Sequence, residues 1–597
     1  MGRTKGTVIM RQDLLALTID DLMTLSNRGI VKRSQQELQS GQLTFELSED
    51  ENGNVSVNWS DQIECRLPID RPLQESICTC PATSICRHLI RSVLVYQEFS
   101  SQTDNNQKIE SQAEASSSQW NPGEISDETL TRFFKKTLNK IRQQFDEGQV
   151  ISLTRSSKPI AQIHTLSCTV RFLVAGDLRY THCDCAESAP CSHVPLAVWA
   201  FRLLEIDRSS GIVSTRQTAY PIPTNLLDDI EKRLEQFVQT GISGAAQSWR
   251  DQVRRLELRC RENSLIWLAE ILSELVQEFD RYIIHDARFS PQHLTELIGE
   301  LCIRSDAIRS NTDAVPQLFI RGSQADRTLE VGSARLIGLG CGVQIKHHSV
   351  ELTAYCQDVD SGAIVALCRN FPDPPDSSEP AKDFDRLAQT SIVKGISLAQ
   401  IGTGKLLIKG GKRTPSHQFL PGRAPVSFNP QAYQWEMLRS SVLVEDFIEL
   451  ADRLSSRPPA SLRPRRLSEN LFVCKVATVE AAAFNSIDQT VEATLRDRSG
   501  NRMRLIHPYT SRGRSGTEVL LSALNQQPEA VFVAGQVVLS AEGLIIAPIA
   551  LILQRSNSRF MLQPWLDSSG SAPSPNHNPS FAHLPIPHLP ISPTSRN

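Results

Sequence analysis

The sequence predicts an α+β multidomain protein, and three observations support this fold class. The chain has 597 residues, which is too long for one hydrophobic core and indicates roughly four domains. A Cys-x-Cys-x5-Cys-x-His motif occurs twice, beginning at Cys78 and at Cys183. Near the C-terminus, apolar runs follow one another in the order β-β-β-α-β-β. Together these features predict two small ββα-type modules, a helical region, a β-rich domain and an OB-like barrel.

The first module is predicted to span residues 1–100. Thr18 occupies the position of a helix cap, and Gly29 the position of a residue that ends this helix. Alternating apolar residues flank Asn52-Gly53, which is the favoured pair for a two-residue hairpin turn. A third strand is expected to lead from this hairpin into the first motif.

The second module, residues 124–210, is predicted to repeat this plan after a disordered linker at 101–123. The linker is rich in Ser, Gln, Asn and Glu and has almost no apolar residues to bury. Residues 130–145 have the apolar spacing of a helix that Gly148 would end, and 168–174 alternate as a strand. The motifs begin 105 residues apart, so the repeat unit is a domain.

Residues 211–312 have helical periodicity, and 249–279 are expected to form one long amphipathic helix. A change to strand and turn patterns predicts a β-rich domain over 313–430. Residues 431–468 are predicted to be a helix, at 433–454, followed by a basic linker that is rich in Pro and Arg.

The OB-like β-barrel is predicted over residues 469–555. Its expected elements are strands at 471–479, 490–496 and 502–506, a helix at 517–525, and strands at 531–539 and 544–552. After residue 555 the sequence is rich in Ser, Pro, Asn and His, so 556–597 are predicted to be a disordered tail.

Each motif supplies three thiols and one imidazole, the Cys3His set that closes a tetrahedral structural zinc site. Cysteines two residues apart on a strand point to one face and can hold one ion. Buried core cysteines or a redox dithiol are the alternatives, and the repeated spacing disfavours both. The sequence therefore predicts two Zn²⁺ ions per chain, with the ligands Cys78, Cys80, Cys86, His88, Cys183, Cys185, Cys191 and His193.

The stretches ICTCPATSICRHLIRSVL and HCDCAESAPCSHVPLAVWAF resemble the SWIM-type zinc finger of bacterial proteins, which has the pattern CxCxnCxH. The resemblance covers roughly residues 20–100 and 125–205. It implies strands before CxC, a helix after CxH and the eight metal ligands named above. For function, it implies binding to DNA or to protein partners.

A second candidate site is a group of arginines in the predicted barrel. Arginines on one face of an OB-fold commonly follow a nucleic-acid backbone. A solvated charged hairpin is the alternative interpretation, because aromatic residues for base stacking are sparse in this segment. Tyr509 and Phe532 are the only candidates nearby. The nucleic-acid-binding residues predicted here are Arg496, Arg498, Arg502, Arg504, Arg512 and Arg514.

Composition limits the partners that the whole chain could attract. The formal net charge is -3, with 40% hydrophobic and 22% charged residues, which gives no overall attraction to DNA or to a membrane. The N-terminus lacks the apolar core of a secretory signal, and the longest apolar run, at 544–553, is too short to span a bilayer. A cytoplasmic protein without a membrane partner is expected.

The predicted function is that of a non-enzymatic, zinc-binding protein that binds DNA or RNA. A protein–protein adaptor or regulatory scaffold is the alternative, and an enzyme with an unrecognised site is the third possibility. No catalytic triad, open metal site or small-molecule substrate emerges from the sequence. The stretch AQIGTGKL has Ala399 and Leu406 where a phosphate-binding loop needs Gly and Ser or Thr.

Overall fold

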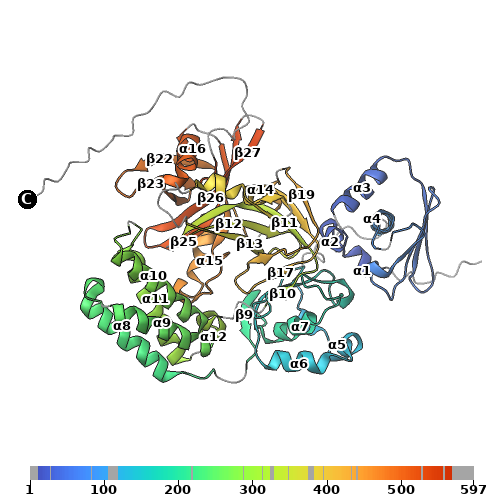
Figure 1. Cartoon of the computed structure of the whole chain (residues 1–597). Coiled ribbons are helices and arrows are strands. Elements are labelled where there is room, and N and C mark those ends of the chain that lie inside the picture. The colour runs from blue at the N-terminus through green and yellow to red at the C-terminus, as the bar shows by residue number, and fades with distance from the viewer. Residues whose placement is uncertain are drawn as a thin grey trace, which may run out of the picture.

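The computed structural model has several packed α and β domains, as Figure 1 shows. The first module lies at one side of the molecule, and the helical bundle and the second module lie below the β-rich sheet. The residues that the structure describes are 11–26, 28–82, 84–104, 119–216, 220–245, 247–286, 288–311, 314–322, 328–346, 349–373, 382–393, 395–431, 433–438, 442–525, 529–555 and 558–567.

The first module contains a four-stranded antiparallel sheet of order β1-β2-β3-β4. Thr18 caps the second helix in a capping box with Asp21. The expectation that Gly29 ends this helix is wrong, because the Ser26 hydroxyl bonds back to the Leu22 carbonyl and ends it earlier. The elements are α1 (Gln12–Leu15), α2 (Ile19–Leu25), α3 (Arg28–Gln39), β1 (Phe45–Glu49), β2 (Val55–Trp59), β3 (Glu64–Leu67), β4 (Ile77–Cys78) and α4 (Arg87–Asp104).

The second module contains a five-stranded sheet of order β8-β7-β6-β5-β9. The helix expected at 130–145 is two helices, because the chain bends after Phe134. β9 pairs with β5, so residues 211–214 belong to this sheet and not to the helical region. The elements are α5 (Asp127–Phe134), α6 (Leu138–Asp146), β5 (Val150–Thr154), β6 (Ile160–Ile163), β7 (Cys168–Phe172), β8 (Thr181–Cys183), α7 (His193–Leu203) and β9 (Ser210–Ser214).

The predicted linker at 101–123 is shorter at both ends in the structure. The helix α4 continues to Asp104, and Trp120 packs edge-on against Phe172, with 5.9 Å between the ring centroids. The prediction of disorder for 105–118 lies outside the described residues.

A helical bundle follows, with one apolar core that its helices share. The single helix expected at 249–279 is two helices, because Ser264 adopts a left-handed conformation (φ 57°) that interrupts the helical path. The elements are α8 (Thr224–Gly244), α9 (Gln247–Glu262), α10 (Ile266–Ile283), α11 (Pro291–Ser310) and α12 (Gln317–Arg321).

The β-rich domain is built on a five-stranded antiparallel sheet of order β13-β12-β11-β16-β19. A smaller sheet of order β10-β17-β18 faces the second module. The elements are β10 (Leu329–Glu330), β11 (Ala334–Ile345), β12 (Ser349–Asp358), β13 (Ile364–Pro372), α13 (Phe384–Ala388), β14 (Ser391–Val393), β15 (Ile396–Ser397), α14 (Leu398–Thr403), β16 (Lys405–Ile408), β17 (Lys412–Arg413), β18 (Phe419–Leu420) and β19 (Val426–Asn429).

One glycine lets the β-rich sheet and the C-terminal barrel approach each other closely. Gly340 lies at a bulge of β11 with φ at +118°, and a Cβ there would stand 2.6 Å from the Cβ of Ala550. A larger residue would therefore clash as well as being strained. The two domains share an apolar core that includes Leu339, Tyr355 and Phe532.

The segment between these two domains differs from its prediction. Among the described residues of this segment, only the last part is an α-helix, α15 (Phe447–Ser455), because β20 (Leu443–Val444) pairs in parallel with the first barrel strand. The basic linker is bound to the rest of the molecule. Arg465 makes two bonds of 2.9 Å to the Glu274 carboxylate of the bundle, and Arg466 lies 3.0 Å from His164 Nδ1.

The barrel has the OB order, with strands running β22-β23-β24-β26-β25-β21 around it and β24 parallel to β26. This confirms the predicted β-β-β-α-β-β order, although the first predicted strand is divided into two. The elements are β21 (Leu471–Lys475), β22 (Thr478–Asn485), β23 (Thr490–Arg496), β24 (Arg502–Pro508), α16 (Arg514–Asn525), β25 (Glu529–Ser540), β26 (Gly543–Arg555) and β27 (Ser558–Leu562).

The prediction of a disordered tail from residue 556 is wrong for 558–567. β27 pairs with β26, and the buried Leu566 follows in the core of the β-rich domain. Residues 568–597 lie outside the described part of the chain. The Trp565 ring packs on the buried His507, with 4.6 Å between the ring centroids.

The buried His507 predicts a pH dependence of barrel stability. Burial lowers the pKa of His507 from 6.5 to about 4, so below pH 6.5 the unfolded chain binds a proton that the folded chain does not. Stability that is complete above pH 6.5 is then lost as the pH falls toward 4, by about 3 kcal/mol. The hydrogen-exchange protection factor of β24, which is corrected for the intrinsic exchange rate at each pH, should therefore fall on acidification in the native chain and much less in His507→Leu; an equal fall in both would exclude His507 as the cause.

Candidate metal centres

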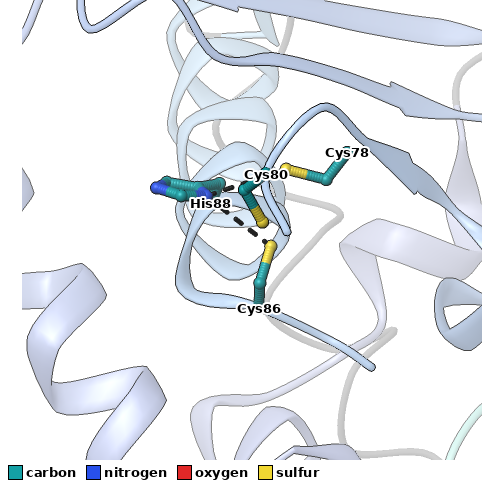
Figure 2. Close-up of side chains that lie close together, drawn as sticks. All are labelled: Cys78, Cys80, Cys86 and His88. Atoms are coloured by element: carbon teal, nitrogen blue, oxygen red, sulfur yellow. Dashed lines mark hydrogen bonds between the residues drawn. The ribbon is translucent and has the colours of Figure 1, made fainter. Parts of the chain in front are cut away.

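The first Cys/His cluster lies between a strand end and a helix start. Cys78 ends β4, Cys80 follows it, and Cys86 and His88 come with the first turn of α4, as Figure 2 shows. His88 Nδ1 is 3.7 Å from Cys78 Sγ and 3.8 Å from Cys86 Sγ. The four ligand atoms all lie within 4.8 Å of one another. The cluster is partly open to solvent at Cys78 and Cys80.

The local sequence explains why these four side chains meet. The antiparallel pairing of β4 with β3 places Cys78 at the edge of the sheet. Three apolar side chains of α4 are buried against this sheet and fix the start of the helix beside it: Leu89, Ile90 and Val93. The cluster thus depends on the same packing that forms the module.

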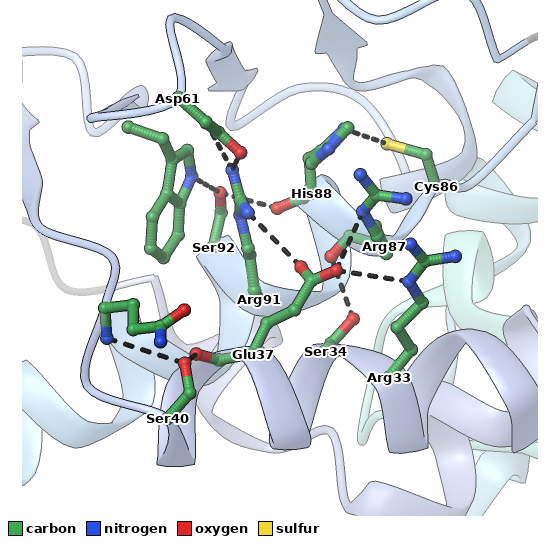
Figure 3. A network of polar contacts seen from close by, with 12 residues as sticks. Arg33, Ser34, Glu37, Ser40, Asp61, Cys86, Arg87, His88, Arg91 and Ser92 are labelled. Atoms are coloured by element: carbon green, nitrogen blue, oxygen red, sulfur yellow. Dashed lines mark hydrogen bonds and ion pairs between the residues drawn. The ribbon is translucent and has the colours of Figure 1, made fainter.

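A network of charged side chains supports the first cluster, as Figure 3 shows. The Glu37 carboxylate of α3 forms ion pairs with Arg33, Arg87 and Arg91, at 3.2, 3.0 and 3.3 Å. Arg91 is buried and also pairs with Asp61 at 2.7 Å. Because Arg87 stands between the two ligands Cys86 and His88 in the sequence, the network ties the metal-binding turn to α3.

A second set of hydrogen bonds, outside the charged network, fixes the backbone of His88. The Ser92 hydroxyl donates to the His88 carbonyl at 2.8 Å, and the Trp59 indole donates to the Ser92 hydroxyl at 3.0 Å. The Arg91 guanidinium lies over the Trp59 ring, 4.1 Å from its centroid. These bonds fix the helix turn from which the imidazole projects.

The second cluster repeats this arrangement in a more enclosed place. Cys183 ends β8, Cys191 precedes α7, and His193 begins that helix. His193 Nδ1 is 3.7 Å from Cys183 Sγ and 3.5 Å from Cys191 Sγ. The ligand atoms again all lie within 4.8 Å of one another. In this cluster Cys185, Cys191 and His193 are all buried.

The second cluster is docked directly on the β-rich domain. Cys185 forms an isolated antiparallel bridge with Val331, and the Ala186 amide donates to the Glu330 carbonyl at 2.9 Å. Beside it, Arg413 and Asp184 form a buried ion pair of 2.6 Å. The first cluster makes no such bridge among the described residues, so the second is placed to join domains.

The spacing of both clusters fits a tetrahedral metal ion. Bonds of about 2.3 Å to sulfur and 2.0 Å to nitrogen place neighbouring ligand atoms about 3.6 Å apart in a tetrahedron. The measured sulfur–nitrogen distances, from 3.5 to 3.8 Å, agree with this value. Within the described residues, these are the two groups of at least three Cys, His, Asp or Glu that could hold a metal ion.

The three thiols of a cluster do not all ionise together in the absence of a cation. Burial raises the pKa of Cys78 and of Cys86 to about 12. Although burial opposes it, hydrogen bonds from the Ala82 backbone and from these two thiols lower the pKa of Cys80. Each cluster by itself therefore favours a single thiolate, and three thiolates require a cation among them. Soft thiolate and imidazole donors suit zinc.

Three of the predicted arginines lie on the outer face of the barrel. Arg496 pairs in register with Arg502, and Arg504 lies two residues further along β24. Arg496 binds the Glu480 carboxylate at 2.8 Å, and Arg504 binds that of Glu542 at 2.6 Å. Arg502 is exposed. The positive charge of this face is therefore partly neutralised by the carboxylates of Glu480 and Glu542.

The other three predicted arginines lie elsewhere. Arg498 is exposed in the turn between β23 and β24. Arg512 donates to the Lys382 carbonyl at 2.9 Å and so joins the barrel to the β-rich domain. Arg514 pairs with Glu518 on α16 at 2.7 Å. The structure does not bring all six arginines to one surface.

The aromatic residues of the barrel correct one prediction and add a residue. Phe532 is completely buried between the barrel and the β-rich domain, so it cannot stack on a base. Tyr509 instead meets Phe484 edge to face, with 6.1 Å between the ring centroids. Phe484 is 39% exposed, and Ile487 in the adjoining loop is 90% exposed. The sequence pattern missed Phe484 because it lies beyond the first predicted strand, at 471–479, in a segment that β22 extends to Asn485.

Fold and clusters together define a modular α+β protein with two Cys3His clusters that could hold metal ions, a helical bundle and an OB barrel. Two family models match the chain: the YehQ four-helical bundle domain over residues 224–322 and the YehQ C-terminal OB-fold domain over 468–583. Protein YehQ of Escherichia coli (strain K12) is 26% identical over 614 residues, which cover 97% of this chain and 94% of that protein.

These similarities extend over 97% of the chain but name no activity. The two family models cover the bundle and the barrel, and neither covers the Cys/His modules. The resemblance of those modules to SWIM-type fingers stays a prediction. Among the helices of the described part of the chain, none has the length and apolarity needed to cross a membrane.

Proposed function

We propose that this chain is a non-enzymatic protein in which two structural zinc ions organise a nucleic-acid-binding scaffold. The agreement of the sulfur–nitrogen distances with a zinc tetrahedron, found in both clusters, is the main support. Zinc would be held by Cys78, Cys80, Cys86 and His88, and by Cys183, Cys185, Cys191 and His193. Four protein donors close each coordination shell, which favours a structural over a catalytic role.

The OB barrel supports nucleic acid as the partner. OB-folds bind single strands on the face of their second and third strands, which are β23 and β24 here. The outer side of that face has Arg504 and, at the end next to the turn between β23 and β24, Arg502. Phe484 pairs in register with the buried Val491 and so belongs to the other side of the sheet, and it meets Tyr509 at the opposite end, where β22 meets β23. Cations to follow phosphates and aromatic rings to stack on bases are the two components of single-strand binding. A cytoplasmic location fits the dependence on reduced thiols.

Binding of single-stranded oligonucleotides should separate these two components. We expect Arg502→Ala to weaken binding and to reduce the dependence of log affinity on log salt by roughly one phosphate contact. We expect Phe484→Ala to lower affinity by about 1–3 kcal/mol with an unchanged salt slope. Fluorescence anisotropy with DNA and RNA strands measures both. Arg254→Ala, which changes an exposed arginine of the bundle, is the control.

A protein partner is the second candidate function, and one observation favours it. A cavity of about 610 Å³ adjoins the first cluster and is lined by Ile30, Pro81 and Ile85 together with Arg33 and Arg87. An apolar cavity with a charged rim is typical of a protein contact. Absence of any oligonucleotide binding at low salt, with a protein that co-purifies after nuclease treatment, would favour this adaptor role over the first candidate.

A further inference from the structure

A fifth cysteine touches the first cluster without belonging to it. Cys65 of β3 pairs in antiparallel register with Cys78 of β4, and their sulfur atoms are 3.7 Å apart. Cys65 is completely buried. The four ligands already fill a tetrahedron, so this thiol is not needed to hold the metal.

The pair has the geometry from which a disulfide forms. Residues directly opposite each other on antiparallel strands have Cα atoms about 4.5–5.5 Å apart, within the range of about 4.4–6.8 Å seen in disulfides. The two sulfur atoms are already in contact and need only side-chain rotation to bond. Neither strand has to move.

An oxidant can reach this cluster more easily than the second one. The 610 Å³ cavity is lined by the ligands Cys80, Cys86 and His88. Cys78 itself is only half-buried. A small peroxide therefore has a path through the cavity to Cys80 and Cys86, and the half-buried Cys78 is the ligand beside them.

The second cluster provides a comparison within the same chain. It also has a fifth cysteine, the buried Cys168, which hydrogen-bonds with the ligand Cys183. There the β-rich domain covers the cluster through the bridge between Cys185 and Val331 and through the Arg413–Asp184 ion pair. The same chemistry is present, but three of its four ligands are buried, against two in the first cluster, and only Cys183 remains half-buried.

We propose that the first cluster is a peroxide-sensitive site in which Cys65 and Cys78 form a disulfide and the zinc ion is released, while the second cluster keeps its metal. The Cys78 thiolate attacks hydrogen peroxide, the O–O bond breaks, and a sulfenic acid and hydroxide form. The Cys65 thiol then displaces the sulfenic hydroxyl, so that the S–S bond forms and water leaves with the thiol proton. The two sulfur atoms lose two electrons to the peroxide, and zinc stays Zn²⁺.

Loss of the metal follows from the loss of one ligand. Cys80, Cys86 and His88 alone leave the ion three-coordinate, and the opened cluster binds it far more weakly. The module then loses the folding energy that the zinc supplies. This inference rests on the proposed zinc binding, and it adds a role for a cysteine that is not a ligand.

The test uses the full-length chain, with its zinc content measured by native mass spectrometry before hydrogen peroxide is added. We expect peroxide to release one of two zinc ions and a peptide map to show a Cys65–Cys78 disulfide. Dithiothreitol with added zinc should restore the second ion. We expect Cys65→Ala to bind two ions at the start and to slow release by roughly an order of magnitude, with reversibility lost.

Two variants control for folding and for general thiol oxidation. Cys65→Val keeps more of the buried volume and serves if Cys65→Ala folds poorly. Cys168→Ala should release one ion as the native chain does. Equal release from the native chain and the Cys65 variants, or a disulfide between two ligands only, would overturn the inference. A chain that carries no zinc before peroxide is added would contradict the proposed function as well.

Discussion

Replacing Cys191 with serine is expected to remove one zinc ion and to destabilise the main body of the chain. Structural zinc contributes about 10–16 kcal/mol of apparent binding energy in small finger modules. Cys191 is buried in the core of the second module, whose sheet and helix meet at the cluster. The loss should appear as a large fall in the thermal unfolding midpoint of the whole chain.

Cys86→Ser in the first module is the matched variant. It should also remove one zinc ion, but in the described part of the chain no strand bridge joins the first cluster to the β-rich domain. We therefore expect unfolding of the first module alone, detected as fast hydrogen exchange in β1 to β4 with the barrel and bundle protected. Cys474→Ser, at a buried cysteine outside both clusters, controls for the loss of a core thiol. Identical effects of Cys86→Ser and Cys191→Ser would contradict the joining role of the second cluster.

Breaking the buried Arg413–Asp184 pair is expected to cost about 3–5 kcal/mol, because removal of one partner leaves the other charge buried and unpaired. The Arg413 Nε atom also donates to the Ser167 carbonyl at 2.7 Å, and Asp184 accepts from the Thr169 amide at 3.0 Å. Arg413→Met should therefore loosen the second module from the β-rich domain. Chemical unfolding of the full chain, followed by hydrogen exchange at β10 and β17, measures this effect.

The double variant Arg413→Met/Asp184→Leu gives the sharper test. It removes both charges and leaves apolar side chains of similar size, so stability should return to within about 1–2 kcal/mol of the native chain. Arg386→Met, at a more exposed arginine of the same domain, is the control. Additive losses in the double variant would show that the two side chains act separately and not as a pair.

The sequence predicted the features that depend on the spacing of residues close together in the chain, namely the two Cys/His clusters and the barrel. The eight cluster residues lie within two short segments, and the turn and helix that bring each set together are encoded there. The sequence also predicted the order of elements in the barrel, because apolar and polar residues alternate along its strands and the helix follows the third predicted strand. In both cases the signal lies within about a dozen neighbouring residues.

Contacts between distant segments could not be predicted in this way. Arg413 and Asp184 are 229 residues apart, and nothing near either one identifies the other. Cys65 looks like an ordinary strand residue until β3 pairs with β4. Strand pairing also explains why the prediction of a disordered tail is wrong for β27, because this strand is stabilised by its hydrogen bonds to β26 and not by its own composition. The structure of such segments is determined by tertiary contacts with distant parts of the chain.

The zinc content of the purified full-length chain is the most direct test of the central claim. Native mass spectrometry should find two zinc ions in the native chain, one in Cys86→Ser, one in Cys191→Ser and none in the double variant. A native chain without zinc, or single variants that keep both ions, would contradict the assignment of the two Cys3His clusters as zinc centres.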